Sequence, residues 1–144
     1  MKQKIINMFS EIAKITRQKI QCELGDELTP AQNAILVYVN CKNNEGINVN
    51  QKDIELEFKI KASSVNSLIT NLQKKQYINK MQDRNDKRIN YITLTKRAKL
   101  LVSRGNTVVN KINNLALCNI PQKDCQNLFN ILQKIKNNLL KEQY

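Results

Sequence analysis

Six consecutive residues, from Asp83 to Arg88, hold three cations and two carboxylates, and a run that alternates polar and apolar side chains follows them. The three cationic side chains can bind phosphates through charge and hydrogen bonds. Groups suited to catalysis are scarce by comparison. The chain has no histidine, the most common general base, and no serine or cysteine lies in a nucleophile motif. Because its three glycines form no phosphate-cradling loop, we expect a binding protein and no enzyme.

The positive charge of the chain is concentrated in its middle third. Residues 58–105 carry 12 Lys and Arg but only 2 Asp and Glu, a local net charge of +10. The net charge is −1 over residues 1–57 and +3 over residues 106–144, which with the middle segment gives the total of +12. A lysine bias from an AT-rich genome would spread along the chain, whereas a surface that binds a polyanion concentrates its charge. The distribution therefore favours a nucleic-acid partner.

The four cysteines form no Cys-x-x-Cys pair, and no histidine is present to complete a zinc site. We expect ordinary thiols in a reducing compartment, with no metal and no cofactor, although a redox sensor built on one of them is an alternative. No stretch approaches the ~20 apolar residues of a membrane span, and the N-terminus lacks the apolar block of a secretory signal. We therefore expect a cytoplasmic protein with no membrane partner. The cysteines are Cys22, Cys41, Cys118 and Cys125.

Two helices are predicted before the basic segment. Apolar residues recur at steps of three and four over residues 5–20, which indicates an amphipathic helix that ends near Gly25. Thr29 can cap the next helix, with a proline at its first position and Gln32 closing a capping box. This second helix should run to about Asn40.

A short helix and a longer one then predict a helix-turn-helix. Asn50 can cap the short helix, and Asp53 favours the positive end of its dipole; its apolar anchors are Ile54, Leu56 and Phe58. The longer helix places Val65, Leu68, Ile69 and Leu72 on one face. Its other face has small hydrogen-bonding side chains that fit a major groove about 12 Å wide, whereas a merely solvated face would favour Glu and Lys. The candidate DNA-binding residues of that face are Ser63, Ser64, Asn66, Ser67, Thr70, Asn71 and Lys74.

Two strands, YINKMQ and INYITLT, are predicted on either side of the loop DRNDK. Asn90, Ile92 and Leu94 share one face of the second strand, so that face can pack on the helices. A hairpin beside a recognition helix is a wing. Its cationic tip can cross phosphates to the minor groove, where a narrow A·T-rich groove attracts arginine. The candidate DNA-binding residues of the tip are Arg84, Asp86, Lys87 and Arg88.

Nearly the whole chain resembles the MarR family of bacterial winged helix-turn-helix regulators. Asp83, Asp86 and Arg88 stand as the D-x-x-D-x-R pattern of the family's wing, and the strand end Ile-Thr-Leu-Thr follows them. LTPAQNAILVYV is similar to the family's second helix, and VNQKDIELEFKIKASSVNSLITNLQKKQYI is similar to its helix-turn-helix. The resemblance implies that Arg88 enters the minor groove, while Asp86 orients it or holds the wing in shape.

Three positions depart from the family's pattern. Asn71 stands where an arginine is usual, Gln76 where a glycine ends the recognition helix, and Ala98 where a glycine follows the Leu-Thr pair. The family's target sequence is therefore not carried over. Without that arginine, other cations should take a larger share of phosphate binding. They are Lys74, Lys75, Arg84 and Lys87.

Two helices are predicted beyond the wing, the first capped by Thr95 and the second opened by Pro121. The second has a continuous apolar stripe, which needs a partner. The resemblance implies that the first helix and the last two intertwine with those of a second copy; packing within one chain is the alternative. A homodimer would place two recognition helices about 34 Å apart and read an inverted repeat in double-stranded DNA.

We therefore expect a mainly α protein with a small β hairpin (α+β): one domain over residues 1–144, with a winged helix-turn-helix at about 30–98 and dimerisation helices at 1–25 and 99–144. The expected function is a dimeric DNA-binding transcription regulator of an A/T-rich inverted-repeat operator, acting as a repressor that a small ligand releases. Alternatives are a thiol-based redox regulator of the same fold and a winged module for RNA or protein, although an aromatic content of 5% disfavours RNA. Tyr38 and Tyr91 are better explained as core or ribbon residues than as the lining of a ligand cleft, so we assign no ligand site.

Overall fold

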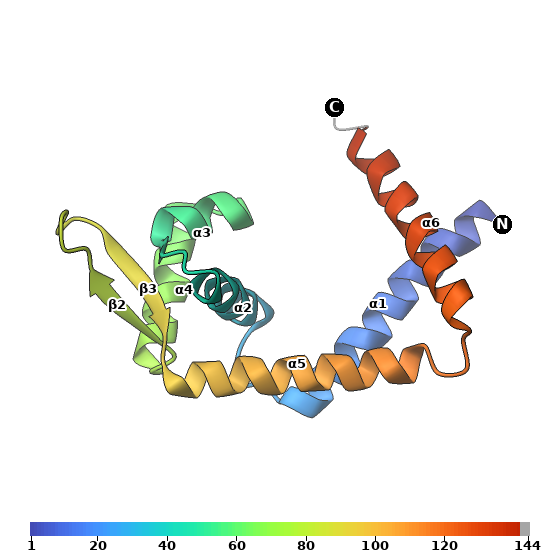
Figure 1. Ribbon diagram of the computed structural model, residues 1–144. Coiled ribbons are helices and arrows are strands. Elements are labelled where there is room, and N and C mark those ends of the chain that lie inside the picture. The colour runs from blue at the N-terminus through green and yellow to red at the C-terminus, as the bar shows by residue number, and fades with distance from the viewer. Residues whose placement is uncertain (142–144) are drawn as a thin grey trace. The chain divides into compact units, whose positions relative to one another are not determined.

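The computed structural model describes residues 1–141, without the side chain of Lys2. Residues 1–109 form one compact unit and the chain from Asn110 onward forms a second, so each is described by itself. The elements in chain order are α1 (Lys2–Leu24), α2 (Pro30–Asn44), β1 (Val49–Asn50), α3 (Gln51–Phe58), α4 (Ala62–Lys74), β2 (Ile78–Gln82), β3 (Asn90–Leu94), α5 (Lys96–Ala116) and α6 (Gln122–Lys141) (Figure 1). This mainly helical architecture with one hairpin confirms the predicted fold class.

The predicted helix starts are present with their hydrogen bonds. Thr29 and Gln32 form a reciprocal capping box at the start of α2, and Asn50 and Asp53 form another at the start of α3. The hydroxyl of Thr95 accepts a hydrogen bond from the backbone N–H three residues later, at 3.2 Å, and so caps α5. These side chains satisfy N–H groups that lack a partner in the first turn of a helix.

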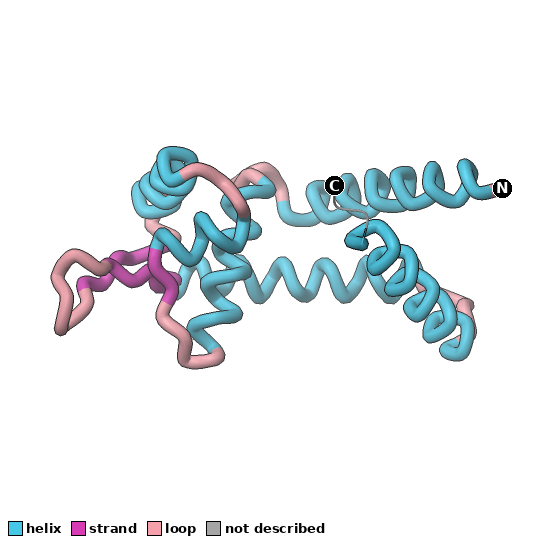
Figure 2. The backbone as a smooth tube through the Cα atoms, turned by 90° about the horizontal axis from the view of Figure 1, so that it is seen from above, coloured by secondary structure: helices cyan, strands magenta, loops and turns pink. Residues whose placement is uncertain are grey.

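The three strands form an antiparallel sheet in the order β1-β3-β2, drawn in magenta in Figure 2. Ile78 lies opposite Leu94 and Lys80 opposite Ile92 in the β2–β3 hairpin, and both of its strands lie within the predicted ones. Ile92 and Leu94 are buried, which confirms that their face packs on the helices. Sequence reasoning missed β1, because a strand of two residues is too short to show an alternating pattern.

The core of the first unit lies between α2, α3, α4, the sheet and the start of α5. It comprises Ile35, Leu36, Val39, Val49, Ile54, Val65, Ile69, Leu72, Tyr77, Ile78, Ile92, Leu94, Ala98 and Val102. The prediction that Leu56 anchors α3 was wrong, because this side chain is 69% exposed. Ile54 is buried instead, and Phe58 is half-buried with its ring edge against Tyr38 at a centroid distance of 5.7 Å.

The second helix extends beyond the predicted end at about Asn40 and continues to Asn44. No helix-breaking residue precedes Gly46, whose φ of +77° belongs to the left-handed region that favours glycine. The predicted end of α1 is confirmed, since the helix stops at Leu24 and Gly25 has a φ of +75°. For α1 and α2, the position of the next glycine therefore predicts the helix end better than the start of the polar turn does.

Residues 1–141 contain no helix that is both long enough and apolar enough to cross a membrane. In the same part of the chain, no three His, Cys, Asp or Glu side chains gather as a metal would require. The four cysteines are unpaired; Cys125 is half-buried and the other three are exposed.

Candidate nucleic-acid interface

The rotation of α4 about its axis is fixed by three apolar side chains. Val65, Ile69 and Leu72 are each fully buried, and the burial of such a side chain contributes roughly 1.5–3 kcal/mol. Since residues three, four and seven apart lie on one helical face, the polar side chains between them must face outward. The packing of α4 therefore decides which residues a ligand can reach.

The structure brings together most of the polar residues predicted on this helix. A shallow hollow of about 330 Å³ lies along the outer face of α4. Ser64 is exposed but does not line the hollow. The six residues that line it are Ser63, Asn66, Ser67, Thr70, Asn71 and Lys74.

The turn between α3 and α4 is held by specific contacts. Lys59 ends α3 in the left-handed conformation, with a φ of 51°. Gln51 donates from Nε2 to the carboxylate of Glu55 at 3.0 Å and to the carbonyl of Ala62 at 3.3 Å. The amide of Gln51 therefore ties the first turn of α3 to the first residue of α4, which fixes one helix against the other.

The tip of the hairpin is shaped by its two carboxylates. Asp83 Oδ1 accepts hydrogen bonds from the backbone N–H groups of Asn85 at 2.7 Å and Asp86 at 2.8 Å. Asp86 Oδ1 accepts from the backbone N–H of Arg88 at 2.9 Å. The backbone N–H groups of Asp86 and Asn85 lower the pKa of Asp83 below its ordinary value, so the carboxylate that closes the turn is charged at neutral pH.

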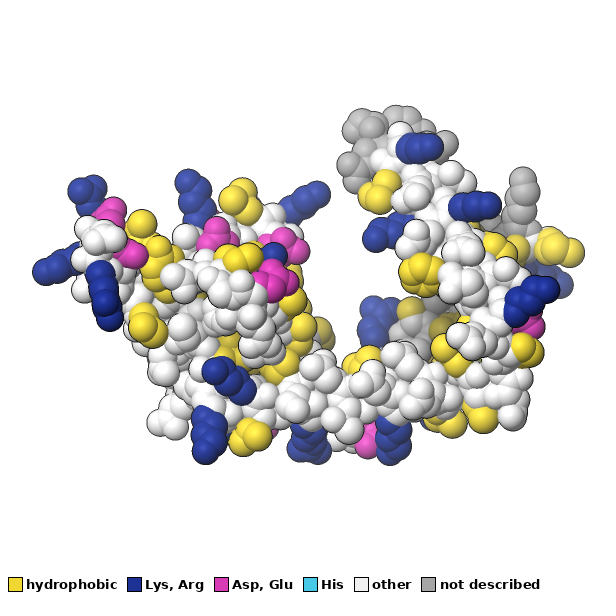
Figure 3. Space-filling model, in the orientation of Figure 1, with side chains coloured by type: hydrophobic (Ala, Val, Ile, Leu, Met, Phe, Trp, Pro, Cys, Tyr) yellow, Lys and Arg dark blue, Asp and Glu magenta, His cyan; other side chains and the backbone are white. Residues whose placement is uncertain are grey.

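The three cations of the tip point into solvent. Arg84, Lys87 and Arg88 are all exposed, the side chain of Arg88 by 95%. Arg88 Nε lies 3.8 Å from Asp86 Oδ1, a longer contact than the bond from the Arg88 backbone to the same carboxylate. Dark-blue side chains project from this end of the hairpin in Figure 3. Asp86 thus braces the backbone of the wing and holds the guanidinium loosely.

A second hollow, of about 390 Å³, adjoins the wing and was not predicted from the sequence. Three cations line it: Lys52 in the first turn of α3, Lys80 in β2, and Arg88. Lys80 lies opposite Ile92, and cross-strand partners share a face, so the register of the hairpin would have placed it here. Neither Lys52 nor Lys80 forms an ion pair within the described part of the chain. We call this hollow the wing groove.

We call the face of α4 on which the six polar residues line a hollow the recognition face. The helix-turn-helix and its hairpin therefore carry three adjoining surfaces that offer hydrogen-bond donors and cations: the recognition face, the wing tip and the wing groove. Lys80 and Arg88 come from the hairpin, and Lys52 comes from the helix that precedes α4. Helical periodicity predicted the first, and the charge cluster with its turn residues predicted the second. The third was not predicted, because the groove exists only once the sheet and α3 are packed.

The chain matches solved winged-helix structures over almost its full length. The S. aureus MepR–DNA complex is 20% identical, with a TM-score of 0.71, and the match covers 95% of this chain and 98% of that one. S. aureus MepR bound to ethidium bromide is 22% identical with a TM-score of 0.72, covering 92% and 94%. The transcriptional regulator Tm0710 of Thermotoga maritima is 16% identical with a TM-score of 0.66, covering 96% of both.

No curated protein sequence matches the chain. The family described as "Transcriptional regulator SarA/Rot" matches residues 18–104, more than half of the chain and all of the helix-turn-helix and wing. MepR is a MarR-family regulator, so the resemblance noted on the wing motif is confirmed at the level of the fold. The chain therefore belongs to the SarA/Rot family of DNA-binding transcriptional regulators and has the winged-helix fold of MarR-like proteins.

Proposed function

We propose that two copies of this protein bind an A/T-rich inverted repeat in double-stranded DNA, with α4 in the major groove and the wing tip in the adjoining minor groove, and repress transcription until a small ligand releases them. The observation that carries the proposal is that the outward face of α4, the wing tip and the wing groove adjoin on one packed unit. These surfaces offer the two kinds of contact that a duplex requires: hydrogen-bonding side chains for base edges and cations for phosphates.

The roles of individual residues follow from their chemistry. Asn66, Ser67, Thr70 and Asn71 are short enough for a helix to approach base edges closely, and asparagine can pair with adenine through two hydrogen bonds. Lys52, Lys74 and Lys80 would contact phosphates. Arg84 and Lys87 would do the same at the wing tip, and Arg88 would enter a narrow A·T-rich minor groove. The solved complex of MepR with DNA supports DNA as the class of ligand.

The proposal of a dimer rests on apolar side chains that one chain leaves exposed. No described residue of α6 is buried. Phe129, Ile131 and Leu139 on α6 are 54%, 53% and 67% exposed, and Ile12 on α1 is 53% exposed. Large apolar side chains left exposed on each of these helices are typical of surfaces that another chain covers. A second copy that covers these helices would pair two wings about a two-fold axis, as an inverted repeat requires.

Release by a ligand is supported by a cavity of about 270 Å³ in the first unit. Its walls come from the end of α1, the linker to α2, the start of α2 and Leu101 of α5. Its size is close to that of small-molecule pockets, and MepR has been solved with ethidium bromide. Tyr38 and Tyr91 do not line it.

The decisive experiment is selection of bound sequences from random duplexes, followed by affinity measurements on the recovered site. A palindrome with half-sites one helical turn apart would support the proposal. The triple variant Arg84→Glu, Lys87→Glu and Arg88→Glu should then lose duplex affinity while remaining folded and dimeric. A matched variant, Lys123→Glu, Lys134→Glu and Lys136→Glu, makes the same change in net charge on α6. Once gel filtration shows that this variant is still a dimer, it should retain most of the affinity.

Two outcomes would overturn the proposal. If the folded wing variant binds the duplex as tightly as the unchanged protein, the wing does not contact DNA. If single-stranded RNA of the same sequence competes as well as the duplex, the partner is RNA. The same assay after treatment with peroxide tests whether a cysteine controls binding.

A further inference from the structure

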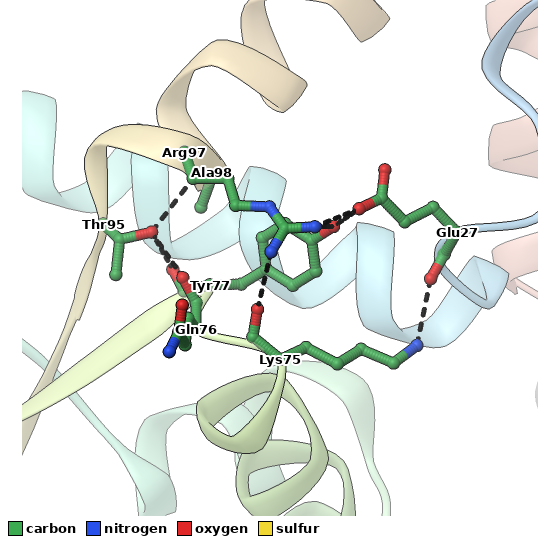
Figure 4. Close-up of polar contacts among 7 residues, drawn as sticks. All are labelled: Glu27, Lys75, Gln76, Tyr77, Thr95, Arg97 and Ala98. Atoms are coloured by element: carbon green, nitrogen blue, oxygen red, sulfur yellow. Dashed lines mark hydrogen bonds and ion pairs between the residues drawn. The ribbon is translucent and has the colours of Figure 1, made fainter.

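Three residues that are far apart in the sequence meet at one junction of the first unit (Figure 4). Glu27 lies in the linker between α1 and α2, Tyr77 precedes β2, and Arg97 lies in the first turn of α5. The buried hydroxyl of Tyr77 donates to the Glu27 carboxylate, and Arg97 Nη2 donates to the same oxygen at 2.5 Å. The guanidinium also lies 4.6 Å from the centre of the Tyr77 ring, a cation–π contact. We call this cluster the hinge junction.

The hinge junction also holds the end of the recognition helix. Lys75, the residue that caps α4, donates from Nζ to the backbone carbonyl of Glu27 at 3.0 Å. Arg97 Nη1 donates to the backbone carbonyl of Lys75 at 3.3 Å. In addition, the hydroxyl of Thr95 donates to the carbonyl of Gln76 at 2.9 Å. The turn that joins α4 to the wing is therefore bonded both to the linker and to the start of α5.

These contacts lie at the two points where the chain enters and leaves the winged part of the first unit. The chain enters the winged part, residues 30–94, through the linker that contains Glu27 and leaves it at the start of α5, where Arg97 lies. These are the only two covalent connections between the winged part and the rest of the chain. The pair formed by Glu27 and Arg97 ties both connections together, beside the end of α4. A second link, from Arg104 Nη2 of α5 to the carbonyl of Glu23 at 3.0 Å, reinforces the same association of α5 with α1.

We propose that Glu27, Tyr77 and Arg97 are positioning residues for DNA binding, which set the angle at which α4 is carried and thereby the half-site spacing that a dimer accepts. This inference rests on the proposed function, because spacing has a meaning only for two recognition helices on one duplex. Glu27 acts through Arg97, Tyr77 and Lys75 and needs no contact with DNA. Glu27 also lines the cavity of the first unit, so a molecule bound there would meet the junction directly.

Glu27→Gln distinguishes positioning from simple electrostatics by the sign of its effect. Removing a carboxylate from a protein that binds a polyanion should strengthen binding if charge alone matters. A positioning role gives the opposite result, because the neutral amide is a poorer acceptor for the guanidinium. Asp26→Asn is the matched control: it removes the same charge one residue earlier, from a carboxylate bonded to Gln21 rather than to the hinge junction.

The assay measures affinity for the selected duplex and for duplexes with one base pair more or fewer between the half-sites. Glu27→Gln should weaken binding to the selected duplex roughly 2- to 30-fold, the range of coupling through such networks, and should reduce the preference for that spacing. Asp26→Asn should bind as well as or better than the unchanged protein. Arg97→Gln and the double variant should show the same loss of preference as Glu27→Gln, because the two side chains act as a pair.

Tyr77→Phe provides a second variant, which removes only the hydroxyl that donates to Glu27 and keeps the ring in the core. If Glu27→Gln does not fold, Tyr77→Phe is decisive and should also broaden the accepted spacing. The inference is overturned if the folded variants keep the spacing preference of the unchanged protein, or if Glu27→Gln and Asp26→Asn strengthen binding equally. These results are distinct from failure of the proposed function, in which the unchanged protein itself selects no spaced repeat.

Discussion

Substituting Arg88 by glutamine should reduce the salt dependence of DNA binding by an amount that can be worked out in advance. The Arg88 side chain is 95% exposed, its nearest carboxylate is 3.8 Å away, and it belongs to both the wing tip and the wing groove. Each phosphate neutralised by a protein cation contributes about −0.9 to the slope of log K against log salt concentration. A dimer loses two such cations, so the slope should become shallower by about 1.8, twice that value.

This change of slope has a measurable consequence. Between about 50 and 200 mM salt, a fourfold range, a difference of 1.8 in slope corresponds to roughly a 12-fold difference in the loss of affinity. Fluorescence anisotropy with a labelled duplex, at several salt concentrations, gives both slopes. Lys134→Gln, on α6, removes a cation outside the proposed DNA-binding surface and should leave the slope unchanged. If Arg88→Gln leaves the slope at the value of the unchanged protein, Arg88 neutralises no phosphate charge and the proposed role of the wing is refuted.

Three further predictions concern the fold and the wing turn. Gln76→Gly should raise the free energy of unfolding by about 0.5–1 kcal/mol, because Gln76 has a φ of 60° that strains any side chain. The control Gln73→Gly, inside α4, should lower the free energy of unfolding by about 1 kcal/mol. Urea denaturation measures both changes. Leu36→Ala should lower the free energy of unfolding by about 2–5 kcal/mol, because Leu36 is fully buried. Leu56→Ala should lower it by under about 0.5 kcal/mol, because the Leu56 side chain is 69% exposed. Equal losses would contradict the burial of Leu36 in the core. In an NMR titration, the carboxyl group of Asp83 should show a pKa below its ordinary value of 3.8. Because that pKa is lowered by folding, the carboxylate's contribution to stability is present above about pH 3.8 and is lost as pH falls through the folded value.

Local interactions explain why much of this fold could be predicted from the sequence. A capping box joins residues three positions apart, so Thr29 with Gln32 and Asn50 with Asp53 are visible in the sequence itself. The wing turn is equally local, since Asp83 bonds to backbone groups two and three residues later. Such features depend on little else in the chain, and the structure has each of them.

The features that sequence reasoning missed depend on tertiary contacts. Glu27 is 50 residues from Tyr77 and 70 from Arg97, and no periodicity relates them. Lys52 and Lys80 line the same groove only because the hairpin packs beside α3. The mistaken prediction for Leu56 is of another kind, because local geometry alone excludes it. A helix turns through about 200° in two residues, so Leu56 points away from the face that Ile54 buries.

The placement of carboxylates accounts for how a segment of net charge +10 remains both ordered and cationic. Residues 58–105 contain only Asp83 and Asp86 as acids, and both accept hydrogen bonds from backbone N–H groups of the wing turn. They therefore fix the shape of the hairpin tip. Among the described residues, the contact from Asp86 to Arg88, at 3.8 Å, is their only ion pair with a side-chain cation. Were these carboxylates instead paired with Lys52 or Lys80, the positive potential of the groove would be cancelled where a phosphate must approach. The acids that do pair closely with cations lie outside the segment: Glu27 pairs with Arg97 at the hinge junction, and neither of these residues lines the hollow on α4. Shape and charge are thus supplied by different side chains, so the wing can be rigid without losing its attraction for a polyanion.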